Sequence, residues 1–440
     1  MQDHPQHLFI AYVLSTFDSH DFDWPQNYEL NPNWGAYTLT YGILRFFSAF
    51  TNIEAAGKLL ISLYVLLMSA VVLRGARHHA HMQQPPWALL LIFAFVFNQT
   101  YFLGFQSYLL SIPFLFFALM DLMDFELRPI TLRSVLYQFG TLTLLFLTHP
   151  FSVLTYLVFG FVLALFHYSN RAMFLKILAP LVLVTLTFII WYLMSSTSAN
   201  GPKYDWQVWW WSLESVAIFY FIMFTGMRWT NGIDFYALTL WISIFGLLFF
   251  IIVRDWKHLR ISKPPVVLLA LTLFGYLTLP YWMGYYAFFN LRLAPVTYLL
   301  LAWILASVSL PRAAGHLYAA LVAGLIALSI NTHANINTET AQLLPILAKM
   351  EKNSAVLPIL LDSRTTVIDP DIFYQLHAHD HYYFHILVGG GVNPLAFPNP
   401  MLPIRLRQDR SWPAPEALEQ LSPYHWQRVI SKYRYVLLRT

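Results

Sequence analysis

The chain has 440 residues, of which 58% are hydrophobic and only 11% are charged. Soluble domains are about 45–50% apolar and about 25% charged, so this chain has too little charge to cover a water-facing surface of its size. The composition excludes a soluble enzyme, a disordered chain and a fibrous protein, and it indicates a polytopic membrane protein. The absence of cysteine also excludes disulfides, thiolate catalysis and Cys-ligated zinc. The net charge of +4 comes with basic residues spread over short loops, so we expect no nucleic-acid partner.

Residues 1–53 are polar and aromatic, and we predict that they form an outer loop with an amphipathic helix near 34–50. Residues 1–15 resemble the outer exit of a membrane helix, although no signal peptide with a basic start and an apolar centre precedes them. Either this segment is translocated unaided or a first span lies upstream of Met1. We favour the upstream span.

Apolar stretches of span length follow the outer loop. Because about 20 apolar residues cross a bilayer core, we predict ten spans within residues 54–331. They cover residues 54–74, 86–103, 106–122, 132–148, 150–167, 174–195, 233–253, 265–283, 294–310 and 314–331. The apolar stretch 209–229 contains Glu214 and three consecutive tryptophans, so we interpret it as an interfacial or re-entrant helix.

Lysine and arginine in short loops predict the orientation of the bundle, because cytoplasmic loops carry an excess of both. One set of alternate loops holds eleven of them: Arg74, Arg77, Arg128, Arg133, Arg171, Lys176, Arg254, Lys257, Arg260, Lys263 and Arg312. The other set, before the tail, holds five: Arg45, Lys58, Lys203, Arg228 and Arg292. The first set is therefore predicted to be cytoplasmic, which places residues 1–53 and 332–440 outside. The absence of cysteine fits a bacterial inner membrane.

The tail, residues 332–440, has the composition of a small soluble domain. We predict helices near 337–352 and 414–422 and strands at 355–361 and 433–438, an alternation typical of a small α/β or α+β domain. The predicted fold class is an α-helical polytopic membrane protein of about ten spans with this C-terminal extramembrane domain.

Two groups in the outer loop could carry chemistry. In Asp3-His4-Pro5-Gln6-His7, an ionised Asp3 could act as a general base or hold a metal, with His7 facing the same pocket. The spacing also suits an ordinary polar loop end. Asp18, Asp21 and Asp23 could bind a divalent cation, or they could form a solvated loop.

Two residues at outer span ends are candidates for ligand binding. His149, before Pro150, lies at a junction between two spans, where a polar group is costly unless it is paired or lines a cavity. A packing or helix-capping role is equally compatible with that position. Arg292 would suit a phosphate or a pyrophosphate, or it could extend to the membrane interface.

The tail offers a further set of metal-binding candidates. His377, His379 and His381 share a face of a strand, and His377, His381 and His385 share a face of a helix, so either geometry could hold zinc. A solvated His-rich segment is the simpler interpretation. The sequence leaves a divalent cation open as the possible cofactor.

This layout resembles the GT-C class of membrane glycosyltransferases. The resemblance covers most of the chain by architecture. It rests on Asp3-His4-Pro5-Gln6-His7, on Tyr28 to Tyr41 leading into an amphipathic helix, on His149-Pro150, on Arg292 before a span, and on the closing segment Tyr433 to Leu438. The chain departs from the pattern because it lacks a first span, and because no compact acidic pair stands beside Asp3; Asp21-Phe-Asp23 lies deeper in the outer loop.

The resemblance implies transfer of a sugar from a polyprenyl-phosphate donor to a hydroxyl of a saccharide, lipid or protein acceptor at the extracytoplasmic face. Asp3 would be the base and His7 would orient it, while Tyr28, His149 and Arg292 would bind the substrate. Trp24, Trp34 and Trp209 could stack on sugar rings or belong to the interfacial belt. The alternatives are a membrane transporter or lipid flippase, and a non-catalytic envelope assembly protein.

Overall fold

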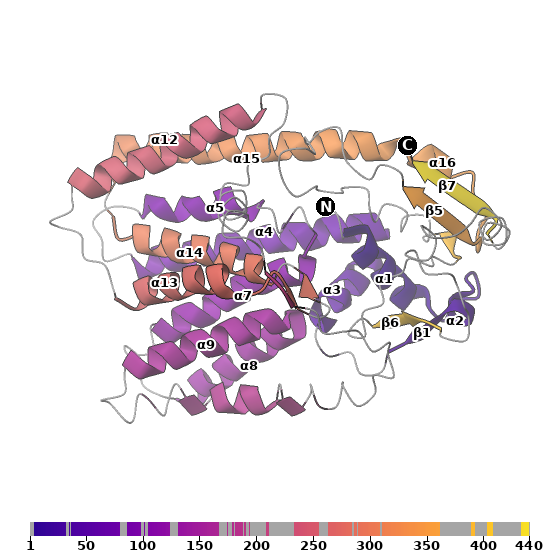
Figure 1. Ribbon diagram of the computed structural model, residues 1–440, viewed down its shortest axis with the longest axis horizontal. Helices are drawn as coiled ribbons and strands as arrows, with labels where there is room; N and C mark the ends of the chain where they lie inside the picture. The colour runs from indigo at the N-terminus through magenta and orange to yellow at the C-terminus, as the bar shows by residue number, and fades with distance from the viewer. Residues whose placement is uncertain are drawn as a thin grey trace.

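The computed structural model is mostly helical and divides into a helical bundle and a smaller part that contains strands (Figure 1). It describes residues 4–31, 35, 37–79, 86–97, 101, 104–123, 131–166, 174, 178–179, 181–187, 189–190, 193, 208–210, 233–254, 263–283, 286–287, 289–308, 310–360, 389–391, 403–407 and 433–439.

The bundle contains most of the long helices. They are α4 (Ile53–His78), α5 (Leu91–Val96) preceded by η1 (Trp87–Leu90), α7 (Gln106–Met123), α8 (Leu132–Thr148), α9 (Pro150–Phe166), α12 (Ile233–Arg254), α13 (Lys263–Thr278), α14 (Leu293–Leu305) and α15 (Arg312–Ala341). Three helices are long and apolar enough to span a membrane: Ile53–His78, Tyr236–Arg254 and the continuous segment Arg312–Leu347. The other apolar helices in the described part of the chain are shorter, at 10–17 residues.

Several helix bounds differ from the predicted spans. Within the predicted span 86–103, residues 87–96 and 101 are helical, while residues 98–100 and 102–103 lie outside the described residues. The predicted span 265–283 ends at Thr278 and then enters strand β3 (Trp282–Met283). The predicted span 314–331 continues to Ala341, so the separate helix expected at 337–352 is instead the end of α15 followed by the short α16 (Leu344–Leu347).

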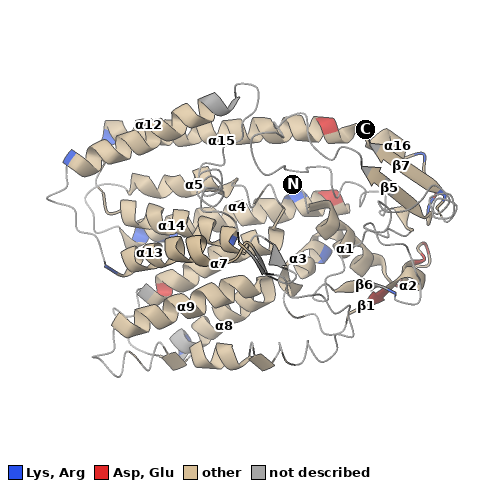
Figure 2. Ribbon diagram, in the orientation of Figure 1, with Lys and Arg blue, Asp and Glu red and all other residues tan. Residues whose placement is uncertain are grey.

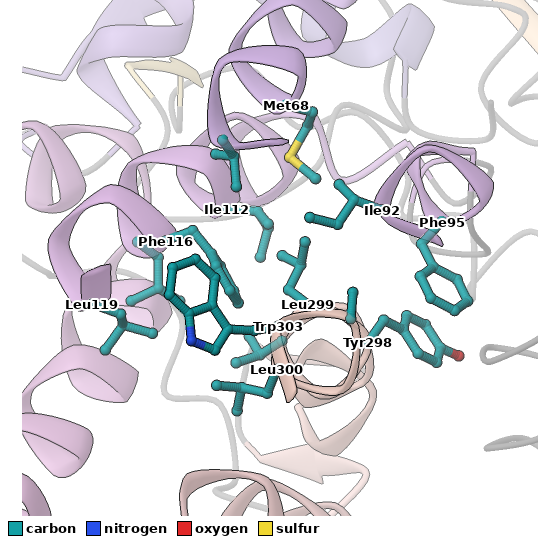
Figure 3. Close-up of a cluster of buried hydrophobic side chains, with 14 of the residues drawn as sticks. Met68, Ile92, Phe95, Ile112, Phe116, Leu119, Tyr298, Leu299, Leu300 and Trp303 are labelled. Atoms are coloured by element: carbon teal, nitrogen blue, oxygen red, sulfur yellow. The ribbon is translucent and has the colours of Figure 1, made fainter. Parts of the chain in front are cut away.

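Helix α14 forms the centre of the bundle because it is apolar on every side. Its side chains contact α4, α5 and α7, as the cluster around Leu299 shows (Figure 3). The rings of Phe95 and Tyr298 stack with their centroids 3.9 Å apart, and Leu299 is 2% exposed. The bundle therefore has one continuous core rather than a pore at this level.

Charge is distributed unevenly along the bundle (Figure 2). Basic residues mark the ends of α12 and α15 that lie away from the strands, whereas acidic residues gather mainly towards the strand-containing part. An acidic residue inside the bundle, Asp121 of α7, forms an ion pair with Arg74 of α4, which also contacts the hydroxyl of Tyr137.

The smaller part, here called the mixed unit, joins the outer loop to the tail. It contains α1 (His4–Thr16), α2 (Trp24–Asn27), β1 (Tyr28–Leu30), α3 (Thr38–Ser48), α16, β5 (Val356–Leu360), β6 (Ile404–Leu406) and β7 (Tyr435–Arg439). Strand β1 pairs antiparallel with β6, and β5 pairs parallel with β7. Residues of α1, α3, β5 and β7 share one hydrophobic cluster, so two segments predicted as separate parts pack together.

The strands β5 and β7 agree with the strands predicted at 355–361 and 433–438, and α3 agrees with the amphipathic helix predicted near 34–50. The helix predicted near 414–422 lies outside the described residues. Where the described helices meet the mixed unit, the short strands β2 (Val208–Trp209), β3 and β4 (Tyr286–Ala287) form an antiparallel sheet.

Candidate functional site

Arg292 lies where the chain enters α14, at the end of the short helix η4 (Asn290–Arg292). Its side chain is buried, and its guanidinium lies over the ring of Phe105, 5.2 Å from the ring centroid. The hydroxyl of Tyr108 donates a hydrogen bond to the backbone carbonyl of Arg292. This hydrogen bond therefore joins the first turn of α7 to the start of α14.

His149 is the residue between α8 and α9, and it is 4% exposed. Pro150 suits the first position of α9, where no backbone N–H is needed, and the backbone N–H of Phe151 donates to Nδ1 of His149 at 3.1 Å. His149 thus caps α9 as an asparagine would. Because Nδ1 accepts this bond, the neutral imidazole carries its proton on Nε2.

The surroundings of His149 keep it neutral. The rings of Tyr37 and Tyr108 lie edge-on to it, with centroids 5.1 Å and 5.3 Å from its own. Burial holds the pKa of His149 well below its ordinary value, and the positive charge of Arg292 and then that of His7 lower it further. Within the described part of the chain Nε2 has no hydrogen-bond partner, so its N–H is available to a ligand.

His7 approaches the same place from α1. Its Nδ1 lies 2.8 Å from the hydroxyl of Tyr41 in α3, and His7 is close enough to His149 for a positive charge on His7 to lower the pKa of His149. His4, one turn earlier, contacts the side chain of Gln106, the first residue of α7. Asp3 lies outside the described residues, but it directly precedes His4 in the sequence.

Tyr37 has an unusual backbone for a bulky residue. Its φ of 70° lies in the left-handed region, which costs a non-glycine residue about 1–3 kcal/mol. Burial raises the pKa of Tyr37, and the nearby Arg292 lowers it by less, so the hydroxyl stays protonated at neutral pH. Strain of this kind is concentrated at functional sites, which supports a role for Tyr37.

Among the described helices that begin at this end, α7, α9 and α14 start at or beside His149 and Arg292, and none of these three has an acidic residue in its first turn. Helix α4 also begins here, next to α1, and carries Glu54 in its first turn. The N-terminus of a helix carries a partial positive charge and free N–H groups, which favour an anion. Together with Arg292, these helix starts make the region electropositive.

Several buried polar atoms belong to the same segments. Ser107 Oγ, Gln106 Oε1 and Asn290 Oδ1 are buried and have no hydrogen-bond partner within the described residues. Such an atom costs about 1–3 kcal/mol when it is left unsatisfied. A ligand with both an anionic group and hydroxyls offers partners for the donors and for the acceptors.

The structure thus brings together three of the predicted residues: His7, His149 and Arg292. Tyr28 does not belong with them, since it is 1% exposed in the core of the mixed unit and packs on Phe9 and Trp24. Trp24 cannot stack on a sugar ring, because it is fully buried and its Nε1 donates to Thr16 Oγ1. Trp34 lies outside the described residues, and the side chain of Trp209 is not described.

The predicted acidic cation site is not formed by the residues that the structure describes. Asp21 is exposed beside Ser19, while one carboxylate oxygen of Asp23 is buried at the start of α2. No three His, Asp or Glu side chains of the described residues come together as metal ligands. The predicted tail candidates His377, His379 and His381 lie outside the described residues, as does His385.

Sequence reasoning missed the residues that surround His149 and Arg292, namely Tyr37, Tyr41, Phe105, Gln106 and Tyr108. Gln106 and Tyr108 could have been found from their position, because their loop was predicted on the same side of the bundle as His149 and Arg292. Tyr37 and Tyr41 lie in the segment from Tyr28 to Tyr41 that carries the resemblance, but nothing singled out these side chains in a chain that is 18% aromatic.

A separate hollow of about 310 Å³ lies in the mixed unit between the start of α4 and the tail. Glu54, Glu351, Met350 and Gly390 are among its lining residues. It contains none of the residues around Arg292, so it is not the site considered above.

No protein-family model matches the chain, and no curated protein or solved structure matches it.

Proposed function

We propose that the protein is an integral membrane glycosyltransferase. It moves a sugar from a polyprenyl-phosphate donor to an acceptor hydroxyl at the end of the bundle that faces the mixed unit. The supporting observation is the convergence of His7, His149 and Arg292, from three separate segments, where three helices begin without acidic first turns. A lipid phosphate would be held by Arg292 and by the Nε2–H of His149.

In the proposed reaction, the acceptor oxygen attacks the anomeric carbon of the donor sugar. The bond from that carbon to the phosphate oxygen breaks, and polyprenyl phosphate leaves with the electron pair. Asp3 takes the proton from the acceptor hydroxyl. His7, which is hydrogen-bonded to Tyr41, orients Asp3. The positive charge near the leaving phosphate stabilises the negative charge that develops on it.

A transporter or flippase is the competing function. It would require ionisable groups near the middle of the helices, and the described ones gather towards the ends (Figure 2). Arg74 and Asp121 within the bundle bind each other. The distribution therefore favours chemistry at one end of the bundle.

The test uses purified protein and a panel of polyprenyl-phosphate sugars, with donor consumption measured for wild type, Asp3→Asn and Asp18→Asn. Asp18 is an exposed carboxylate of the same loop and serves as the matched control. Turnover that is lost in Asp3→Asn and kept in Asp18→Asn would support the proposal. Turnover that survives in Asp3→Asn would move the base elsewhere. Binding of the donors without any turnover by wild type would contradict a transferase and favour a flippase.

A further inference from the structure

Helix α3 has two faces with different environments. One face carries Thr40, Tyr41 and Leu44, which are buried against α1, α4 and the bundle. The opposite face carries Phe46, which is 61% exposed, and the chain just beyond the helix carries Phe50, which is 76% exposed. The two rings meet edge to face with centroids 5.3 Å apart, so they form one apolar protrusion.

This protrusion is continuous with the apolar outer surface of α4. Asn52 caps α4 by accepting the backbone N–H of Ala55, so the helix begins three residues after Phe50. Leu59, Leu66 and Leu73 then form an exposed stripe along α4, with exposed fractions of 39%, 66% and 62%. Because α4 is long and apolar enough to span a membrane, lipid is the occupant that fits this stripe.

Two cations belong to the same two segments, since Arg45 directly precedes Phe46 and Lys58 directly precedes Leu59. Arg45 and Lys58 are both exposed, and neither makes an ion pair with any residue that the structure describes. Aromatic rings at the level of the headgroups, with basic side chains beside them, are typical of helices that lie in a membrane interface.

We propose that Phe46 and Phe50 insert into the boundary between headgroups and acyl chains, and that Arg45 and Lys58 bind phospholipid phosphates. The bilayer then holds α3 from outside while the inner face of α3 supports Tyr37 and Tyr41 in the site. This inference does not depend on the proposed reaction, because it concerns the contact of α3 with lipid alone.

The chain contains no cysteine, so a single introduced cysteine carries the only spin label. We would label Phe50→Cys in phospholipid nanodiscs of the whole chain and compare its accessibility to oxygen with its accessibility to a water-soluble nickel complex. Leu66→Cys on α4 is the control inside the bilayer, and Lys349→Cys on the mixed unit is the control in water. The label at position 50 is expected to lie between the two controls and to favour oxygen. A label at position 50 as accessible to nickel as the one at 349 would overturn the proposal.

A second variant tests the headgroup contact. In nanodiscs of mixed phospholipids, Arg45→Gln/Lys58→Gln should weaken the enrichment of anionic lipid around a fluorophore at position 50, by about fivefold per cation, from about 1 kcal/mol per basic residue. Unchanged enrichment in this double variant would refute the assignment of the two cations.

Discussion

The middle of the bundle and the end that faces the mixed unit are both buried, yet they are built from different atoms. Around Leu299 the interior is mostly carbon, with Phe95 stacked on Tyr298, and the hydroxyl of Tyr298 and the indole nitrogen of Trp303 are the polar side-chain atoms drawn there (Figure 3). Around Arg292 the interior holds a guanidinium, an imidazole and the side-chain oxygens of Gln106, Ser107 and Asn290, which have no hydrogen-bond partner among the residues that the structure describes. Helix α14 belongs to both regions, since Arg292 precedes its first residue and Leu299 lies in its middle.

This contrast separates residues kept for stability from residues kept for a ligand. Burial of Leu299 stabilises the fold, whereas each unsatisfied polar atom near Arg292 costs about 1–3 kcal/mol. A chain that only had to fold would place apolar side chains there as well. We therefore expect substitutions in the two regions to have effects of different kinds.

The largest effect on stability is expected from Leu299→Ala. It leaves a cavity among α4, α5, α7 and α14 and should lower the free energy of unfolding by about 2–5 kcal/mol. Thermal unfolding in detergent measures it. Leu66→Ala is the matched control, because that side chain is 66% exposed and its truncation should change stability by less than about 0.5 kcal/mol. Equal losses in both variants would contradict the placement of the core.

Arg292→Gln should weaken donor binding by about 10–150-fold, because a hydrogen bond to a charged group contributes about 1.5–3 kcal/mol. Titration of the purified protein with a polyprenyl-phosphate sugar measures this change. Arg74→Gln is the contrasting variant: it leaves the carboxylate of Asp121 buried without its cation and should destabilise the fold while sparing donor affinity. A loss of donor affinity as large in Arg74→Gln as in Arg292→Gln would remove the special role of Arg292.

Two variants of His149 can distinguish a contact with the ligand from a helix-capping role. His149→Asn keeps a side-chain acceptor for the N–H of Phe151 but removes the Nε2–H, whereas His149→Ala removes both. We expect both variants to lose about tenfold in donor affinity, and only His149→Ala to lose about 1 kcal/mol of stability. Nearly unchanged donor affinity in His149→Asn would restrict His149 to capping.

The neutral state of His149 also predicts a pH dependence of stability. Its folded-state pKa is lowered by burial and by the nearby cations, so between that value and about 6.5 the unfolded chain binds more protons than the folded one. Stability should be complete above about pH 6.5 and should fall as pH drops below it, by up to about 1.4 kcal/mol per pH unit. Denaturant titrations at several pH values should show a shallower slope in His149→Asn. If stability changed with pH equally steeply in His149→Asn and in wild type, other titratable groups would account for the pH dependence.

The sequence predicted the elements whose signal is local. Long apolar runs located α4, α8, α9 and α12 within a few residues, and β5 and β7 were located by their apolar residues. The pairing of β1 with β6 could not be predicted, because it joins segments at opposite ends of the chain.

The candidate site likewise contains residues that a local sequence pattern indicates and residues that only the folded structure indicates. His149 and Arg292 were predicted as candidates because polar residues are rare at the ends of apolar spans, and the structure buries both at one end of the bundle. Tyr37 was missed because its φ is a property of the folded backbone, and Tyr28 was misassigned because a tyrosine in the core and one in a site look alike in sequence.

The smallest expected effect comes from Ser107→Ala at the start of α7. Its hydroxyl is buried with no partner among the described residues, so its removal should leave the unliganded protein equally stable or about 1 kcal/mol more stable. The same variant should bind the donor several-fold more weakly, because the hydroxyl can no longer donate to the ligand. Unfolding without ligand and donor titration, made on one preparation, measure both quantities. Ser69→Ala on α4 is the control, since that hydroxyl already donates to the carbonyl of Val65 and its removal should leave donor affinity unchanged. A gain in stability without a loss of donor affinity would place Ser107 outside the ligand site. A gain in stability together with a loss of donor affinity would show that the hydroxyl is retained for binding although it makes the fold less stable.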